Sequence, residues 1–330
     1  MHKFRRSFLM KTSISAMAML TIKPAVAMKA KSYPDKPVHL YVPYPPGAAT
    51  DTLGRLSGDV LAKALGQPVV VENRGGGGTV IGTRAVASSS PDGYSIGMVD
   101  SAFTINPALR GESLPYDTLN DFSPITLIAT APFVLVVHPS VKATDLKSFI
   151  ALAKSDPGKL TFASPGVGTA PHLAGEQLQQ QTGIKAQHIP YRGGGTVFTD
   201  LLGGQVDFAF ATAPTLREYI ASGRLRAIAT TSQQRISSLS EIPTFSEAGF
   251  PGIDTSPMFG LIGPANVPAP IIEQLSQTIA KSVKSGVLGS KLAELGFDAV
   301  GSSHQKFRAY IASEIEKWNE VIKQGDFKVE

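Results

Sequence analysis

The chain has 330 residues and no cysteine, with 31 lysines and arginines against 26 aspartates and glutamates. The absence of cysteine excludes disulfides, thiolate nucleophiles and cysteine-based zinc sites. Five of the basic residues and none of the acidic ones lie in the first 27 positions, so the rest of the chain has 26 of each sign. That balance argues against a nucleic-acid partner, whose binding domain would be basic.

Residues 1–27 have the pattern of a secretory signal peptide. A basic segment containing Arg5 and Arg6 precedes an apolar stretch at 12–22, and Ala25 and Ala27 supply the small residues of a cleavage site. We therefore expect cleavage after about Ala27 and a periplasmic location. A membrane-spanning helix needs roughly 20 apolar residues, so an anchoring helix is the less favoured alternative. The two arginines fit general export and twin-arginine export equally well.

Strand and helix patterns alternate after the signal. Short apolar runs predict strands at 38–42, 69–71 and 94–99, and amphipathic spacing predicts helices at 53–65 and 80–87. This order predicts a mainly parallel sheet with helices on both faces.

The same alternation continues in the middle of the chain, which is long enough overall for two cores. The expected strands are at 133–138, 160–163, a segment ending at 189, 206–211 and 225–230. The expected helices are at 146–154, 170–181, 196–202 and 216–221.

The C-terminal part differs, because it holds two long amphipathic helices, one opening at Pro268 and one at 304–324. We expect this tail to return to the first core and cover it. The predicted fold is therefore α/β, a two-lobed periplasmic binding protein of type II with a ligand cleft between the lobes. Lobe 1 would comprise 28–130 plus 250–330, and lobe 2 would comprise 131–249.

Four loops follow strands and precede helices, which is where open α/β sheets bind ligands. The first is 43–51, in which prolines stiffen the chain and Gly47 lets the backbone approach a guest. Its N–H groups lie at a helix N-terminus, which favours an anion. Asp51 is a candidate cap for that helix, and a tight turn without ligand is the alternative.

The other loops offer polar groups of several kinds. Ser164 could donate to a carboxylate, Thr169 could cap the next helix, and His172 is either a packing residue or a ligand contact. Arg192 could pair with a carboxylate or form a surface salt bridge. Asp207 lies in an apolar strand, where it needs a partner such as a neighbouring loop or an amine on the ligand.

The candidate ligand-binding residues taken together are Tyr44, Gly47, Ala48, Ala49, Asp51, Ser101, Ser164, Gly168, Thr169, His172, Tyr191, Arg192 and Asp207.

Catalytic and cofactor motifs are missing from the sequence. The glycine run at 75–78 fits no G-x-G-x-x-G frame, and no P-loop or G-x-S-x-G elbow occurs. His172 and Glu176 share a helix face, but two residues do not make a metal site. We therefore expect no enzyme activity, no cofactor and no metal. An exported hydrolase using Ser164 or Ser101 is the alternative, and it would need a general base within reach.

Several stretches give the chain a resemblance to the Bug family, the TctC-like solute-binding components of tripartite tricarboxylate transporters. They lie at 33–37, 43–51, 66–74, 91–94, 105–109, 164–176, 190–193, 202–207, 222–227 and 242–249. Together they span nearly the whole chain after the signal.

The resemblance implies a type II binding-protein fold that captures a small carboxylate for membrane transporter subunits. A membrane sensor kinase is the alternative partner, and a monomer is expected. In this family the loop ending here at Asp51 and the facing loops of lobe 2 hold the carboxylate, often through bridging waters. The family usually has a second glycine where this chain has Ala48, whose methyl group would narrow the pocket or tilt the turn. Aliphatic di- and tricarboxylates, amino acids, aromatic acids and nicotinate-like compounds all fit the family's range.

Overall fold

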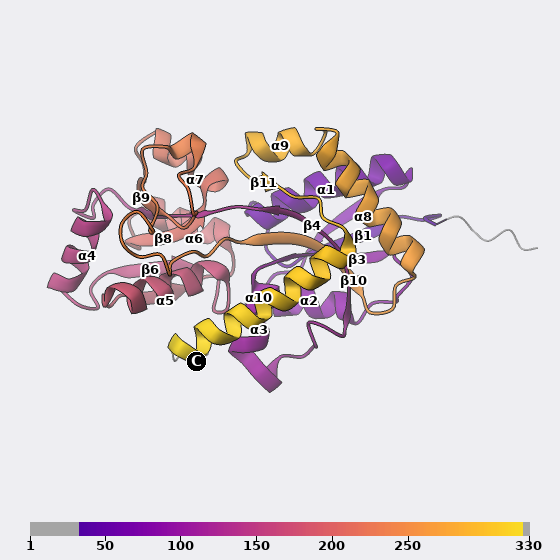
Figure 1. The fold of residues 1–330 in the computed structure, drawn as a ribbon, viewed down its shortest axis with the longest axis horizontal. Coiled ribbons are helices and arrows are strands. Elements are labelled where there is room, and N and C mark those ends of the chain that lie inside the picture. Colours follow the sequence, from indigo (N-terminus) through magenta and orange to yellow (C-terminus); the bar gives the residue numbers. More distant parts are fainter. Residues whose placement is uncertain (1–32, 326–330) are drawn as a thin grey trace, which may run out of the picture. The chain divides into compact units, whose positions relative to one another are not determined.

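The computed structural model describes residues 33–325, and Figure 1 shows two sheets, each flanked by helices. The predicted signal peptide and the first residues of the predicted lobe 1 lie outside this range. Among the described helices, each is too short or too polar to cross a lipid bilayer.

The first sheet has six strands in the order β11-β4-β10-β3-β1-β2. Their bounds are β1 (Val38–Val42), β2 (Val69–Asn73), β3 (Ser95–Asp100), β4 (Phe122–Thr130), β10 (Met258–Pro264) and β11 (Asp298–Ala299). Strand β1 is parallel to β2 and β3, as expected. Strand β10 is antiparallel to both β3 and β4, and β11 is antiparallel to β4.

The expectation of a mainly parallel sheet is therefore wrong. Strands β3 and β4 end on the side of the second sheet, whereas β10 comes back from that sheet and must run in the opposite direction. Neither β4 nor β10 was among the predicted strands, so their directions were not considered.

The second sheet has five strands in the order β7-β6-β8-β5-β9. They are β5 (Phe133–Val137), β6 (Thr161–Ser164), β7 (Gln187–Pro190), β8 (Phe208–Thr212) and β9 (Arg226–Thr230). Strand β6 is parallel to β7 and β8, while β5 is antiparallel to β8 and β9. Only Ala131 and Pro132 separate β4 from β5, so the chain passes directly from one sheet to the other.

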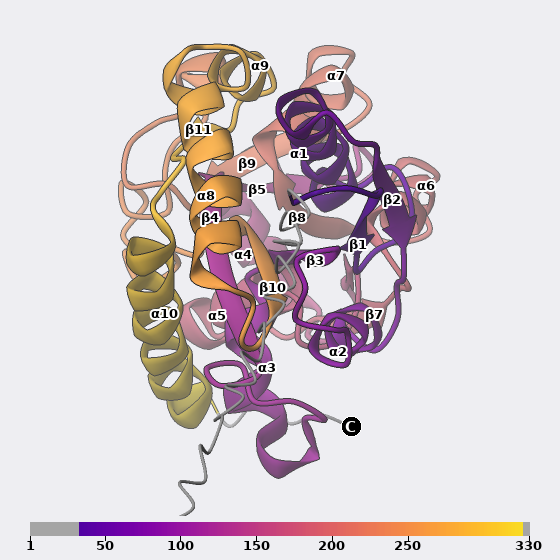
Figure 2. The same ribbon diagram turned by 90° about the vertical axis from the view of Figure 1, so that its right-hand side faces the viewer.

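The helices around the first sheet are α1 (Ala49–Leu65), α2 (Val80–Ala87), α3 (Ala102–Arg110), α8 (Ala269–Lys284), α9 (Gly289–Glu294) and α10 (His304–Gly325). Those around the second are α4 (Leu146–Ser155), α5 (Ala170–Thr182), α6 (Gly194–Leu202) and α7 (Ala213–Ala221). Figure 2 shows α8 lying over β4, with α10 beside it.

Each sheet has a hydrophobic core of its own. In the first, Leu40 and Ile96 from the strands pack with Leu53 and Leu61 of α1 and Leu275 of α8. These helix positions follow the three- and four-residue spacing that places apolar side chains on one face.

In the second sheet, Phe162 and Phe208 pack with Phe149 of α4 and Leu173 of α5. Each sheet therefore has a separate core. Loops that follow the strands of one half extend toward loops of the other half.

Helix α10 contributes to both halves of the molecule. Phe307 and Ile311 belong to a cluster with Phe103 and Met258 of the first half. Trp318, two turns further on, is fully buried in the cluster that contains Phe149 of the second half. The tail therefore covers the first sheet, as expected, but its last turns also pack against the second half.

Candidate functional site

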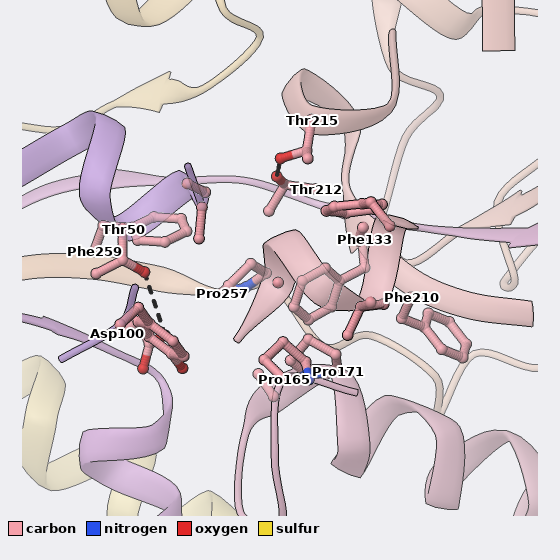
Figure 3. Close-up of a pocket in the computed structure, with 18 residues that line it drawn as sticks. Thr50, Asp100, Phe133, Pro165, Pro171, Phe210, Thr212, Thr215, Pro257 and Phe259 are labelled. Atoms are coloured by element: carbon pink, nitrogen blue, oxygen red, sulfur yellow. Dashed lines mark hydrogen bonds between the residues drawn. The ribbon is translucent and has the colours of Figure 1, made fainter. Parts of the chain in front are cut away.

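A cavity of about 80 Å³ lies between the two sheets, lined by residues from both (Figure 3). From the first half come the start of α1, the end of β3 and the start of β10. From the second half come the starts of α5, α6 and α7 and parts of β5 and β8. The lining residues are Tyr44, Ala48, Ala49, Thr50, Asp100, Phe133, Pro165, Ala170, Pro171, Gly194, Val197, Phe198, Phe210, Ala211, Thr212, Thr215, Pro257 and Phe259.

Four helices begin at this cavity. Ala49 opens α1, Ala170 opens α5 and Gly194 opens α6, while Thr212 is the residue before α7, and all four line the cavity. The first N–H groups of a helix have no partner within it, and the helix dipole adds positive potential there. The cavity is consequently suited to an anion without any cationic side chain.

The side chains of the lining are mostly apolar. Phe133 and Phe259 contribute aromatic side chains to the lining together with Val197 and several prolines, whereas the ring of Phe210 points away and stacks on Phe245. No lysine, arginine or histidine is among the lining residues. The described residues also contain no group of three His, Cys, Asp or Glu side chains that could hold a metal ion.

The first loop is held from behind by the carboxylate of Asp51. Arg55 donates two hydrogen bonds to it, at 3.0 and 3.1 Å, and the Asn73 amide donates a third at 2.8 Å. The N–H of Gly47 donates a fourth at 3.1 Å. Burial raises the pKa of Asp51, but these hydrogen bonds and the charge of Arg55 together bring it below its usual value. The carboxylate is therefore ionised and fully occupied by the protein.

This arrangement differs from two expectations. The residue before α1 is Ala48, and Asp51 lies inside the helix, where its side chain turns back to Gly47 instead of capping the helix. The expected donor at Gly47 is thus already used. Gly47 has a φ of +96°, which favours glycine, while Ala48 is extended at −89° and tolerates its methyl group.

The second loop is held by uncharged groups. Ser164 is completely buried, and its Oγ lies 2.7 Å from Nε2 of His188 and 3.1 Å from the carbonyl oxygen of Gly166. His188 stacks on His172 with ring centroids 4.3 Å apart. The N–H of Gly168 donates to Nδ1 of His172 at 3.4 Å.

The two imidazoles are neutral over the usual pH range. Burial and the neighbouring His188 lower the pKa of His172 to about 3. Burial lowers the pKa of His188 to about 4. Removing imidazoles from water disfavours their charged form.

A hydrolase using Ser164 would need a general base within reach, and His188 meets that condition. However, the Ser164 side chain is buried behind the loop and is not part of the cavity lining. Ser101 is equally buried, and its Oγ accepts the N–H of Met258 at 3.0 Å. Both serines therefore hold backbone segments together, and neither is open to a substrate from the cavity.

Thr169 and Asp207 also form hydrogen bonds within the second half. Thr169 precedes α5 as expected, but its hydroxyl donates back to Gly166 at 2.7 Å and caps no helix N–H. The Asp207 carboxylate accepts the N–H and hydroxyl of Thr161 at 2.8 and 2.9 Å, and so joins β6 to the start of β8.

The third loop contributes a bond of the same kind. The hydroxyl of Tyr191 donates to Asp200 at 2.6 Å, and burial together with this bond raises the pKa of Tyr191 to about 12. Arg192 is exposed and lies outside the cavity lining.

Of the predicted residues, Tyr44, Ala48 and Ala49 line the cavity. Nine others lie behind or beside it: Gly47, Asp51, Ser101, Ser164, Gly168, Thr169, His172, Tyr191 and Arg192. Asp207 lies before β8, whose opposite end lines the cavity. Thr50 and Asp100 lie in two of the four predicted loops but were not among the candidate residues. Phe259 was missed because its strand was not predicted.

Loops of the two halves touch around the cavity. A methyl group built on Gly193 would come within 2.8 Å of the Pro45 ring. One built on Gly78 would overlap the carbonyl oxygen of Val167. These glycines lie where two backbones approach too closely for a side chain.

A two-sheet fold with a cavity between the sheets, bordered by helix N-termini, is the architecture of a solute-binding protein. The sequence of residues 53–327 matches the family described as the tripartite tricarboxylate transporter family receptor, TctC. The chain therefore belongs to that family, and its resemblance to Bug proteins is confirmed.

Proteins with similar sequences and structures support this family assignment. The protein BugT of Bordetella pertussis is 36% identical over 306 residues, covering 92% of this chain and 94% of BugT. The structure of the periplasmic binding protein BugD has a TM-score of 0.85 at 30% identity, covering 90% of this chain and 99% of that one. A Rhodopseudomonas palustris protein, Rpa4515, solved with adipate, has a TM-score of 0.86 at 31% identity, covering 89% and 98%.

Proposed function

We propose that this chain is an exported, monomeric receptor that binds a small carboxylate in the cavity and passes it to membrane subunits of a tripartite tricarboxylate-type transporter. The observation that carries the proposal is the convergence of four helix N-termini on one cavity whose lining has no cationic side chain. Two similar proteins, one solved with adipate and one with bound malate, support a carboxylate as ligand.

The location and the lobes belong to the same proposal. Export with cleavage after about Ala27 would place the protein in the periplasm, where BugD is found. The lobes would be 28–130 plus 250–330 and 131–249, closing on the ligand about the crossings between the two sheets. The division of strands between the sheets supports these boundaries. Closure requires that the ligand bind the closed form more tightly than the open form.

The carboxylate would lie against the first turn of α1, where Ala48, Ala49 and Thr50 line the cavity. Proline at the first helical position lacks an N–H but has a suitable φ. The extended conformation of Ala48 also suits a residue that precedes proline. Ala49→Pro thus removes one donor while leaving the helix able to form.

The test is calorimetry with a panel of mono-, di- and amino-carboxylates, together with thermal shift and product analysis. Loss of a charge-assisted hydrogen bond costs about 1.5–3 kcal/mol, so Ala49→Pro should bind roughly ten- to a hundredfold more weakly. Ala49→Ser keeps the N–H and should bind like the parent. Full affinity in a folded Ala49→Pro protein would contradict this placement, and a reproducible product would contradict a receptor without catalysis.

A sensor kinase in place of a transporter remains the alternative partner. The soluble receptor would bind its ligand in the same way for either partner, so the cavity does not favour one. Genes for two membrane transporter subunits beside this gene would support the proposal, and genes for a sensor pair would contradict it.

A further inference from the structure

Asp100 is the one acidic side chain in the cavity lining. It ends β3, and its Oδ1 accepts the N–H of Ala102 at 3.0 Å. Its Oδ2 accepts from the hydroxyl of Thr50 at 3.5 Å, and the Tyr44 hydroxyl also bonds to this carboxylate. Figure 3 shows Asp100 at one end of the cavity beside Thr50 and Phe259. The carboxylate thus faces the space that a ligand would fill.

None of these partners carries a positive charge. Burial raises the pKa of Asp100 above its usual value, and the hydrogen bonds from Tyr44, Ala102 and Thr50 offset only part of that rise. All three groups donate to the carboxylate and so favour its ionised form, which a cation beside it would favour further. Charged groups inside proteins are normally paired, because an isolated buried charge is costly.

Asp51, the residue after Thr50, illustrates the usual solution. Its carboxylate is buried, whereas that of Asp100 is partly exposed, and Arg55 neutralises it through two hydrogen bonds. No lysine, arginine or histidine among the described residues lines the cavity beside Asp100. The positive partner of Asp100 is therefore missing from the protein at the place where the ligand binds.

We propose that Asp100 receives a cationic nitrogen of the ligand, so that the cavity selects zwitterionic acids over acids of net negative charge. This inference rests on the proposed function, since the helix N-termini would hold the carboxylate of the same ligand. The aromatic side chains of Phe133 and Phe259 in the lining suit such a ligand, because they would contact its apolar body and attract an adjacent ammonium group.

The test uses pairs of acids that differ only in the cationic nitrogen. Suitable pairs are proline and cyclopentanecarboxylate, glycine betaine and 3,3-dimethylbutanoate, and 5-aminopentanoate and hexanoate. Calorimetry on the purified chain should show at least one zwitterion binding more than tenfold more tightly than its partner. These pairs cover two spacings between charge centres and three kinds of ammonium group: secondary, quaternary and primary.

Asp100→Asn keeps the size of the side chain and removes its charge. In this variant the preference for the zwitterion should fall below threefold, while the partner that lacks the cationic nitrogen binds as well as before or better. Circular dichroism and the melting temperature check that the variant is folded. The comparison of paired acids on the unmodified chain does not depend on the folding of the variant.

The outcomes separate this inference from the proposed function. Equal binding of both members of every pair by the unmodified chain overturns the role of Asp100 and leaves carboxylate binding intact. A preference that survives Asp100→Asn also overturns it. If no member of any pair binds and neither adipate nor malate binds, the proposed function fails as well.

Discussion

The loops before α1 and α5 both border the cavity, but opposite kinds of chemistry hold them. Behind the first loop, an ionised Asp51 is bound by Arg55, whose side chain is about half exposed at 51%. Behind the second, neutral Ser164 and His172 are buried, and both contact the neutral, partly exposed His188. A charged network therefore holds the loop of the first half, whereas uncharged groups hold the loop of the second half.

Removal of the Asp51 carboxylate should produce the largest effect. Asp51→Ala leaves Arg55, Asn73 and Gly47 without their shared acceptor, and because Arg55 is half exposed to solvent, the loss should cost about 2–3 kcal/mol. Urea unfolding should show this loss. Asp59→Ala, on an exposed position of the same helix, should change stability by less than about 0.5 kcal/mol. A variant at Asp51 as stable as the one at Asp59 would show that the charged network does not hold the loop.

The contact between the two halves can be tested with two neighbouring glycines. Gly77 and Gly78 have φ values of +60° and +61°, so an alanine is similarly strained at either position. A methyl group at Gly78 would overlap Val167 across the cleft, whereas one at Gly77 meets Val80 at an ordinary 3.6 Å. We expect both variants to lose similar stability.

Only Gly78→Ala should also weaken carboxylate binding, by about tenfold or about 1.4 kcal/mol, because it opposes closure. Calorimetry with an acid that the unmodified chain binds measures this difference. Equal affinities in the two variants would contradict a role for the close approach of the loops.

The pH dependence should come from the second loop. Because the pKa of His172 is lowered to about 3 in the folded chain, the unfolded chain binds more protons below its ordinary pKa of about 6.5. The contribution of this group to the free energy of unfolding is therefore fully present above pH 6.5. It falls as the pH drops toward 3, by up to about 1.4 kcal/mol per pH unit. His188 contributes in the same direction.

Thermal unfolding between pH 7 and pH 5 measures this slope. His172→Asn should give a shallower slope than the parent, even if its stability at pH 7 is lower. An unchanged slope would mean that His172 can take up a proton in the folded chain.

The smallest effect is expected at Arg192. Its side chain is exposed and lies outside the cavity lining, so Arg192→Ala should change carboxylate affinity by less than twofold. A loss of more than tenfold would show that the third loop, and not the helix N-termini, clamps the anion. The main contact with the anion would then lie in the third loop and not in either of the first two.

Local sequence patterns were enough to predict most of the fold. The predicted helix at 80–87 coincides with α2, and the predicted helix at 53–65 ends at the same residue as α1, which Gly66 terminates with a left-handed φ of +67°. The strands β4 and β10 were not predicted, because both join the two halves and are buried nearly throughout. Long-range pairing, which no local pattern records, determines their place.

The site was predicted only as a set of loops. Ser164 and Asp51 were expected to meet the ligand because they are polar and lie beside helix N-termini, yet both point away from the cavity. A loop sequence does not show which residues face inward and which anchor the turn. Asp100 and Thr50 could have been found only by treating each polar neighbour in the loop as a candidate.

The chain has one tryptophan, and its position gives the molecule an intrinsic optical reporter. Trp318 is 1% exposed and packs near the end of α10 against the second half, while Phe307 fixes the start of the same helix in the first half. A change in the angle between the halves would shift the indole relative to its neighbours. Emission from the unlabelled chain should therefore follow ligand binding in real time.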